Sequence, residues 1–463
     1  MVATTRAKGP NTDLAALIEA CGVSHKWLAR RVNELAAERG VTTAYTHTGV
    51  SRWTAKGMVP RDPAPACVAV ALGERLGRPV TLAEIGMGEA REAGPDVGLD
   101  FPRDPDTALR GAIQHWSTPM INRRSLLHGS FAIGAYTVPT LRWLGTPADA
   151  VPVTPDPRGR RVGRTDLDQL WEASEEARRW DSRFGGGHAK APAVTRLLRE
   201  RAVPLLQGHF TEQLGRELLT AVSELARVSA WSSFDMGDHG PAQRDFVQSL
   251  RLARAAGDRE AGAYTLATMS LQAMLRGYPE EAIDMAQGAY EQAQHAAAPR
   301  VLAFIKLAEA RAHGRAGDGR AAGRALAVCE NLLDSIHPGT RDPAHLAYLT
   351  HQRISTDAAE IHKDLGQPQA ALRWGHQAGP MSASDFARAT GIRCTVLAVA
   401  HLQNNDLPSA LAAGERATAI LGPVRSARAH AYLRDVTTAL RPWRGQDQVA
   451  DFLHRAGTVL ATA

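Results

Sequence analysis

The residues with the clearest chemical potential lie between Tyr45 and Pro60, in the order Tyr-Thr-His-Thr-Gly-Val-Ser-Arg-Trp-Thr-Ala-Lys-Gly-Met-Val-Pro. Short polar side chains open this segment, while Val50 and Trp53 fall on one helical face. A helix that reads DNA needs polar side chains for base edges, an apolar face to seat it and cations for phosphates. We therefore predict that DNA contacts come from the following residues, the first two on the preceding helix: Arg30, Arg31, Thr46, His47, Thr48, Ser51, Arg52 and Lys56.

The charge distribution agrees with an anionic partner for this part of the chain. Between Met1 and Arg61 nine basic residues face four acidic ones, within a chain whose formal net charge is +6. A positive field over a small helical module is typical of nucleic-acid binding. The plain alternative is a small helical bundle whose arginines and threonines are only solvated.

Two further groups of residues are candidates for binding. The turn Gly185-Gly-Gly-His188 could hold a phosphate with its backbone N–H groups, but it lacks the Lys-Ser/Thr of a phosphate-binding loop. A flexible turn between helices is the simpler interpretation. Farther along, polar residues could line a pocket around a break between helices: Trp231, Asp235, His239, Gln243 and Arg244. The alternative there is an Asp235–Arg244 ion pair with Trp231 packed inside.

The sequence contains few features typical of a catalytic or metal-binding site. The seventeen histidines form no HExxH pattern, and the four cysteines stand singly. We expect no metal, no cofactor and no catalytic residue, so the chain is predicted not to be an enzyme; only the glycine-rich turn and the scattered histidines would argue for one. Isolated cysteines fit a reducing compartment, and the first residues lack the apolar core of a secretory signal. We therefore expect a cytoplasmic protein that does not bind membranes.

The elements that must position these residues are helices. Aromatic residues make up only 5% of the chain, and alanine, leucine and arginine are abundant, which favours an all-α fold. In the first 88 residues we expect five helical elements. The first is capped by Thr12 and ended by Gly22, and the second is capped by Ser24 and ended by Gly40. The third spans Thr48–Lys56 and stops at Gly57, the fourth spans about Ala64–Leu76, and a final turn begins with the capping box of Thr81 and Glu84.

Residues 89–166 are rich in glycine, proline and charge around one apolar stretch, and we predict a linker region with an apolar helix. Within the stretch 122–144, Arg123 and Arg124 precede a mostly apolar run, an arrangement that resembles a twin-arginine export signal. It lies far from the start of the chain and is interrupted by Pro139 and Arg142, so a buried or interfacial linker helix is the preferred interpretation.

Residues 167–463 show internal repetition. Breaks near Gly237, Gly277 and Gly317 are forty residues apart, and further breaks fall at Gly366 and Asp406. Each break is followed by proline or glycine and then by Ala-Leu, Ala-Ile or a similar small-apolar pair. We expect five helix pairs between about 211 and 460, with small residues allowing close approach of antiparallel helices.

These patterns resemble two known groups of proteins. Residues 12–87 are similar to the Xre (lambda-repressor-type) helix-turn-helix family, although the connection from Gly40 to Thr46 is longer than the usual tight turn. The repeats resemble tetratricopeptide repeats with a longer period. The segments 181–192, 231–244 and 252–258 add a resemblance to actinobacterial regulators with tetratricopeptide domains, which implies control of differentiation or antibiotic production.

The expected architecture is therefore an N-terminal helix-turn-helix bundle and a C-terminal tetratricopeptide-like α-solenoid. We expect a homodimeric regulator of transcription that binds double-stranded DNA, with the repeats sensing a peptide or small molecule or docking a partner. Besides Trp231 and Asp235, ligand contacts are predicted on the inner helices, from Gln272, Lys306, Arg311, Arg393 and Gln403. The alternative is an interaction scaffold without specific DNA binding.

Overall fold

The computed structural model describes residues 9–38, 41–60, 64–76, 80, 84–87, 98–117, 131–145, 149, 153–187, 194–382 and 385–461. Within these ranges the chain is all-helical and has no strand; Arg161 and His209 form one isolated bridge. The chain divides into two compact units, Met1–Asp96 and Val97–Ala463. None of the described helices is long and apolar enough to cross a membrane. The predicted all-α class is confirmed.

The described part of the N-terminal unit packs four helices around one apolar core. They are α1 (Thr12–Ala20), α2 (His25–Glu38), α3 (His47–Lys56) and α4 (Ala64–Leu76). Helix α2 contacts both α3 and α4, and α1 contacts α3. The core is formed by buried apolar side chains that recur at helical spacing, among them Leu14, Leu28, Val32, Val50, Trp53, Val68 and Leu72.

The ends of these helices follow the predicted signals with one exception. The Ser24 hydroxyl accepts a hydrogen bond from the Trp27 amide (3.1 Å), and Gly57 ends α3 with φ +57°. The predicted Thr12 cap is wrong, because Asn11 accepts the hydrogen bond from the Leu14 amide. The Asn11 amide also donates to the carbonyl of Ile85 (2.8 Å), which ties the start of the unit to its end. Gly40 and Thr81 lie outside the described residues.

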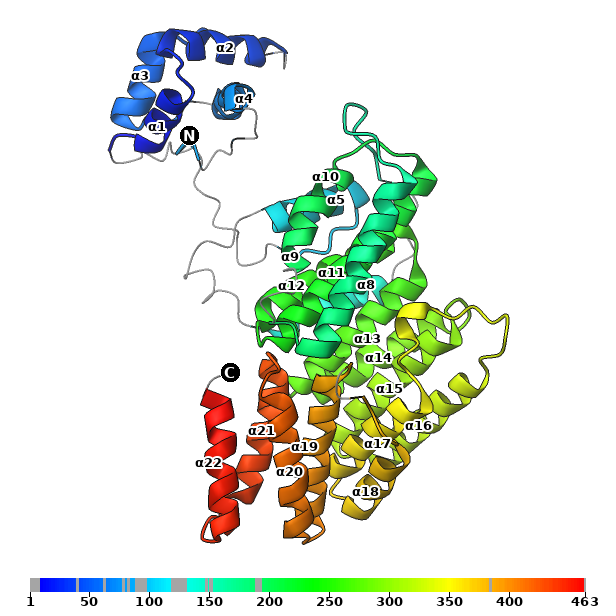
Figure 1. Ribbon diagram of the computed structural model, residues 1–463. Helices are drawn as coiled ribbons and strands as arrows, with labels where there is room; N and C mark the ends of the chain where they lie inside the picture. The colour runs from blue at the N-terminus through cyan, green and yellow to red at the C-terminus, as the bar shows by residue number, and fades with distance from the viewer. Residues whose placement is uncertain are drawn as a thin grey trace. The chain divides into compact units, whose positions relative to one another are not determined.

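The larger unit is dominated by a series of antiparallel helix pairs. In chain order they are α11 (Glu212–Asp235) with α12 (His239–Ala256), α13 (Arg259–Leu275) with α14 (Pro279–Ala293), α15 (Pro299–Ala316) with α16 (Gly319–Asp334), α17 (His351–Asp364) with α18 (Pro368–Gln377), α19 (Ala387–Gln403) with α20 (Leu407–Leu421), and α21 (Ala427–Leu440) with α22 (Asp447–Ala461). The first helix of each pair contacts the first helix of the next, and Figure 1 shows the pairs following one another in chain order.

The predicted breaks are confirmed, and the predicted number of pairs is wrong. The described part of the larger unit contains six pairs rather than five, because α21 and α22 were not expected as a pair. Gly237, Gly277, Gly317 and Gly366 all adopt positive φ at the breaks. At the fifth break the residue with positive φ is Asn405 (+60°), one position before the predicted Asp406. Such conformations favour glycine and asparagine.

The described parts of the predicted linker region are packed into the larger unit. They include α5 (Pro105–Ser117), the 3-10 turn η1 (Ile133–Tyr136) and α7 (Thr137–Gly145). Tyr136 and Trp143 are buried in the same core as the first repeat helices, and Trp116 joins a second core beneath α11. The apolar stretch is therefore helical and packed from Ile133 onward, whereas Arg123 and Arg124 lie outside the described residues.

One long helix outside the pairs, α8 (Arg164–Phe184), packs against the first and the fifth pair through α11 and α19. Helix α11 also contacts α21. The end of the series thus returns to its beginning, with α8 beside the junction. A short irregular helix precedes the first pair and is built from α9 (Val194–Leu197), a π-helical turn (Leu198–Ala202) and α10 (Val203–Leu206).

Candidate functional site

Helix α3 presents a continuous polar face. Its side chains alternate at helical spacing between a buried set, Val50, Trp53 and Thr54, and an exposed set. The exposed set contains every residue that the sequence predicted for this helix and its cap: Thr46, His47, Thr48, Ser51, Arg52 and Lys56. The predicted helix is confirmed, and its exposed face carries two cations and four short polar or imidazole side chains.

The helix is held by its buried face and by the segment before it. The Trp53 ring is only 4% exposed and meets the Tyr45 ring edge-on, with 5.1 Å between ring centroids. The Asn33 amide on α2 donates to the Tyr45 carbonyl and accepts from the Tyr45 amide, both at 2.9 Å. These contacts order the long connection between α2 and α3 and fix where α3 begins.

The two arginines predicted on α2 differ in their surroundings. The Arg30 side chain is 72% exposed and lies 3.6 Å from the Glu34 carboxylate. The Arg31 guanidinium instead donates two hydrogen bonds to Glu74 on α4, at 2.9 and 2.7 Å, and lowers the pKa of that carboxyl. Arg31 therefore joins two helices of the N-terminal unit, while Arg30 remains open to a partner.

The larger unit contains a partly open cavity of about 510 Å³. Its walls come from the first helix of each of the six pairs and from α8, so the series of pairs surrounds it. Each first helix contributes residues three or four positions apart, for example Val228 and Trp231 on α11, or Thr268 and Leu271 on α13. That spacing places them on one helical face, which means that one face of every inner helix looks into the same space.

The segment between α16 and α17 covers part of this cavity. It contains a 3-10 turn (η3, Ala344–Leu346), and His345 and Tyr348 line the cavity. The His345 ring lies against the Tyr264 ring, with 5.5 Å between centroids. Burial lowers the pKa of His345, so its imidazole is favoured in the neutral form.

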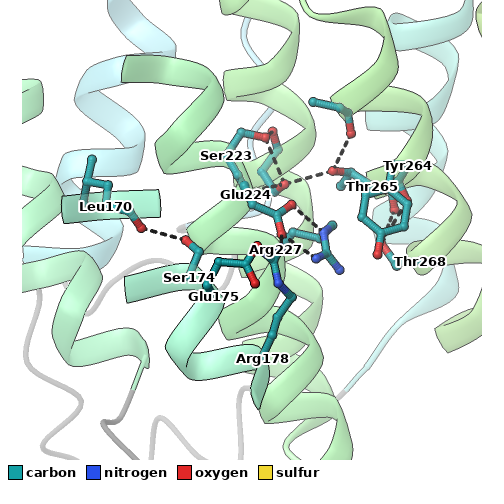
Figure 2. A network of polar contacts seen from close by, with 12 residues as sticks. Leu170, Ser174, Glu175, Arg178, Ser223, Glu224, Arg227, Tyr264, Thr265 and Thr268 are labelled. Atoms are coloured by element: carbon teal, nitrogen blue, oxygen red, sulfur yellow. Dashed lines mark hydrogen bonds and ion pairs between the residues drawn. The ribbon is translucent and has the colours of Figure 1, made fainter. Parts of the chain in front are cut away.

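The first of three ionic clusters around the cavity joins α8 to α11. Arg227 donates to both oxygens of Glu224, at 2.8 and 2.6 Å, and Arg178 reaches the same carboxylate from α8, as Figure 2 shows. Burial alone would raise the pKa of Glu224, but the charges of Arg227 and Arg178 outweigh it and hold the pKa at about 2. The Arg227 guanidinium also lies 4.2 Å from the centre of the Tyr264 ring.

The second cluster joins α15, α17 and α21. Arg311 donates to Glu360 at 2.8 Å, and the Tyr432 hydroxyl donates to the other oxygen of the same carboxylate at 2.5 Å. Arg353 pairs with Asp357 at 2.7 Å. Burial would raise the pKa of Glu360, yet the neighbouring cations, led by Arg311, hold it at about 2.

The third cluster joins the end of the series to its beginning. Arg388 on α19 donates to both oxygens of Asp181 on α8, at 2.7 and 2.6 Å, and lies 2.9 Å from Asp235 on α11. Arg428 on α21 donates to the other oxygen of Asp235 at 3.0 Å. We call these four side chains the closing cluster. Their relative exposures are all below 15%, so water screens their charges little.

The glycine-rich turn lies beside the closing cluster and is tightly packed. The Gly186 amide donates to Asp235 (3.3 Å), and the Gly187 amide donates to the Arg425 carbonyl (3.2 Å). A Cβ atom on Gly185 would lie 2.4 Å from the Arg425 carbonyl oxygen, and its φ is +82°. The predicted turn after α8 is confirmed, its glycines permit close backbone approach, and the two amides have protein partners. His188 lies outside the described residues.

The structure distributes the predicted ligand residues between the cavity wall and other environments. Trp231, Arg311 and Arg393 line the cavity. Asp235 is fully buried behind it in the closing cluster, where the charges of Arg388 and Arg428 outweigh burial and lower its pKa. The expected partner of Asp235 was Arg244, but its carboxylate pairs with arginines that lie more than a hundred residues later in the chain.

The other three predicted ligand residues point elsewhere. The buried Gln272 amide donates to the His239 carbonyl (3.1 Å) and accepts from the Tyr136 hydroxyl. Lys306 pairs with Glu309 at 2.7 Å, and Gln403 donates to the Lys363 carbonyl at 3.0 Å. Gln272 and Lys306 each lie one position from a cavity residue, Leu271 and Leu307, so each of these two predictions missed the cavity face by one residue.

Several cavity residues had not been singled out, and one signal in the sequence could have found some of them. The spacing between the breaks at Gly317 and Gly366 is forty-nine residues instead of forty. The additional residues belong to the segment that places His345 and Tyr348 over the cavity. The remaining missed residues, such as Tyr264 and Phe304, stand on helices that are buried on nearly every side, where periodicity marks no particular face.

Comparison with known protein families finds a match in the N-terminal part of the chain. Residues 14–88 match the family described as the SP15 N-terminal domain. The matched range corresponds to the N-terminal unit, including α3, and spans a minority of the chain. No curated protein matches the sequence.

Proposed function

We propose that this protein is a DNA-binding transcriptional regulator whose larger unit binds an effector. In this proposal the N-terminal unit is a helix-turn-helix domain of the Xre type, with α3 as the recognition helix. The larger unit is a tetratricopeptide-like repeat domain that surrounds the effector. The protein acts as a homodimer, and its resemblance to actinobacterial regulators favours control of differentiation or secondary metabolism.

The observation that carries the proposal is the two-sided character of α3. Val50 and Trp53 are buried, while six polar or cationic residues of the helix and its cap are exposed together. A recognition helix must expose such side chains at its N-terminal end, because these residues reach base edges in the major groove. The exposed Arg30 on α2 is available for a neighbouring phosphate.

Titration of the full-length protein with promoter DNA tests the proposal. Fragments are first selected by genome-wide mapping of DNA bound to the native protein. Fluorescence anisotropy then gives the dissociation constant at several salt concentrations. Specific binding should weaken with a slope of about −0.9 per neutralised phosphate in a plot of log affinity against log salt.

Two variants separate base contact from general charge. Arg52→Ala should weaken binding to the selected fragment by about 1–3 kcal/mol if this side chain contacts a guanine. Arg75→Ala, which removes the same charge from α4, is the matched control and should leave specificity unchanged. If no fragment binds with a salt-dependent affinity, the DNA-binding proposal is wrong and an interaction scaffold becomes the better interpretation.

A further inference from the structure

The cavity in the larger unit has the size of a small-molecule site. Its volume of about 510 Å³ falls within the roughly 300–1,000 Å³ typical of pockets that hold organic ligands. One part of its wall is apolar and aromatic, with Trp231, Leu271, Phe304 and Leu307. Burial of such a wall against a ligand removes apolar surface from water and lowers the free energy, so the wall favours a ligand with an apolar body.

Most of the charge around the cavity is already balanced within the protein. Six of the nine arginines that line it belong to the three ionic clusters. Six carboxylates accompany them, namely the five already described and Glu175, which pairs with Arg178; Glu224 and Asp235 lie behind the wall. The charges of a buried ion pair compensate each other, so such a pair attracts a charged ligand only weakly. The charge available for recognition must therefore come from the remaining ionisable residues of the wall.

Those residues leave an excess of positive charge. They are Arg179, Arg183 and Arg393, opposed by the single carboxylate of Asp385. None of the three arginines has a carboxylate within ion-pair distance among the residues that the structure describes. Arg179 and Arg183 are exposed and stand one turn apart on α8, whereas Arg393 is half-buried on α19. An excess of two positive charges in a partly closed space attracts an anion.

Arg393 is the group best placed to bind that anion. Its Nη1 donates to the Gly379 carbonyl at 2.7 Å, while its Nε is buried and has no hydrogen-bond partner among the described residues. Burial, with the nearby charge of Arg416, lowers the pKa of Arg393. The guanidinium thus lines the cavity without a carboxylate partner among the described residues and retains hydrogen-bonding capacity for a charged acceptor.

The neighbours of Arg393 connect this cation to the apolar wall. Ile392 and Val396 lie on the same helix, α19, and both line the cavity. We propose that the cavity binds a small organic anion, with a carboxylate or phosphate on the Arg393 guanidinium and an apolar body against Trp231 and the inner-helix side chains. This inference rests on the effector half of the proposed function and specifies the chemical class of the effector.

Three matched fluorescent probes test the site on the full-length protein: 4-(1-pyrenyl)butyrate, 4-(1-pyrenyl)butyl phosphate and neutral 4-(1-pyrenyl)butanol. Calorimetry measures stoichiometry and affinity, and pyrene emission gives an independent signal. We expect one molecule of at least one anionic probe per chain, bound about tenfold or more tightly than the alcohol. The two anionic probes distinguish a carboxylate from a phosphate as the preferred group.

Variants assign the binding to this cavity. Arg393→Gln should weaken binding of the anionic probe by about tenfold to a hundredfold, the range expected for a lost charged hydrogen bond. The affinity for the alcohol should change by about twofold or less. Arg373→Gln, which removes an exposed arginine from α18, is the control and should change neither. Ile392→Trp should weaken binding of all three probes, charged and neutral, because the larger side chain fills the cavity.

The probe-binding measurements test the anion site independently of the DNA-binding experiment. Equal affinity for the alcohol and the anions, or an unchanged affinity in Arg393→Gln, would show that Arg393 binds no anion. Binding that survives Ile392→Trp would place the probes outside this cavity and overturn the inference. Because none of these measurements contains DNA, anion binding without DNA binding would refute only the regulator proposal, and the reverse result would refute only the anion site.

Discussion

The closing cluster offers the most demanding test of how the larger unit is held together. Replacement of Arg388 by methionine removes both hydrogen bonds to Asp181 and the contact to Asp235, while Arg428 stays with Asp235. The Asp181 carboxylate is then buried without a cation. Removing one partner of a buried ion pair costs about 3–5 kcal/mol, mainly because the remaining charge is desolvated and unpaired.

This free energy translates into a measurable change in melting temperature. An unfolding entropy of about 2.1 cal/mol/K per residue gives roughly 0.8 kcal/mol/K for a unit that spans Val97–Ala463. The expected loss of about 3–5 kcal/mol therefore lowers the melting temperature by about 4–6 °C. Arg373→Met, on the exposed face of α18, is the control and should shift it by about 1 °C or less.

Hydrogen exchange locates the effect and provides the stricter criterion. Because Arg388 joins α19 to α8 and α11, Arg388→Met should increase exchange in these three helices and leave α14 and α16 unchanged. The double variant Asp181→Leu with Arg388→Met should recover much of the lost stability, since no unpaired carboxylate remains at that position. A melting temperature unchanged by Arg388→Met, or faster exchange spread evenly over all pairs, would refute the role assigned to this cluster.

The contribution of Asp235 to this cluster also has a defined pH dependence. Its pKa in the folded protein lies below the ordinary value of 3.8. A carboxyl whose pKa is lowered by folding stabilises the protein fully above its unfolded pKa and loses this contribution as the pH falls through the folded value. Acid titration of the parent protein should therefore leave the contribution of Asp235 to the free energy of unfolding intact at neutral pH and remove it only as the pH falls below 3.8.

Three further predictions concern other parts of the chain. Gly185→Ala should destabilise the larger unit by about 1 kcal/mol or more in thermal denaturation, because an added Cβ meets the Arg425 carbonyl and φ is positive. Asn33→Ala should lower the stability of the N-terminal unit by about 1–3 kcal/mol and weaken DNA binding, because it releases the segment before α3. His239→Gln should flatten the fall in stability between pH 6.5 and about 4, because burial lowers the pKa of His239 to about 4 and protonation therefore favours unfolding in that window.

Each of these predictions has its own control. Gly323→Ala, at an open position in helix α16, should be neutral or slightly stabilising, so equal losses at both glycines would contradict the close-approach argument. For Asn33, chemical denaturation should show the loss in the N-terminal transition, and a variant with unaltered stability would contradict the anchoring role. For His239, the difference in stability between variant and parent should change between pH 6.5 and about 4 and stay constant below that range; profiles that run parallel within this window would show that the imidazole does not titrate with unfolding.

The repeating helix pairs could be predicted from the sequence because each break depends on the conformation of a few neighbouring residues. Gly237, Gly277 and Gly317 mark breaks that need positive φ, and the sequence alone reveals them at regular spacing. The last pair was missed because its break lies in a short proline-containing turn at Arg441–Trp443. Local signals of this kind are reliable when a backbone conformation requires a particular residue type, and they fail where several types are equally suitable.

The candidate sites differ in how far the sequence could define them. On α3, Val50 and Trp53 establish which face is buried, so the exposed polar residues follow directly from helical periodicity. On α13 every residue from Gly262 to Met274 is buried. Periodicity therefore contains no information about which face meets the cavity, and Gln272 was predicted where the adjacent Leu271 lines the wall.

The sequence by itself determined the helical class, the helix boundaries around α3 and the repeating pairs, because propensity, capping and glycine conformation act over a few neighbouring residues. Only the tertiary structure decided which charges meet. Asp181, Asp235, Arg388 and Arg428 come from four helices, and their pairing depends on the curvature accumulated over all the intervening pairs. The same curvature determines the size of the cavity and leaves Arg393 without a carboxylate partner in the described chain.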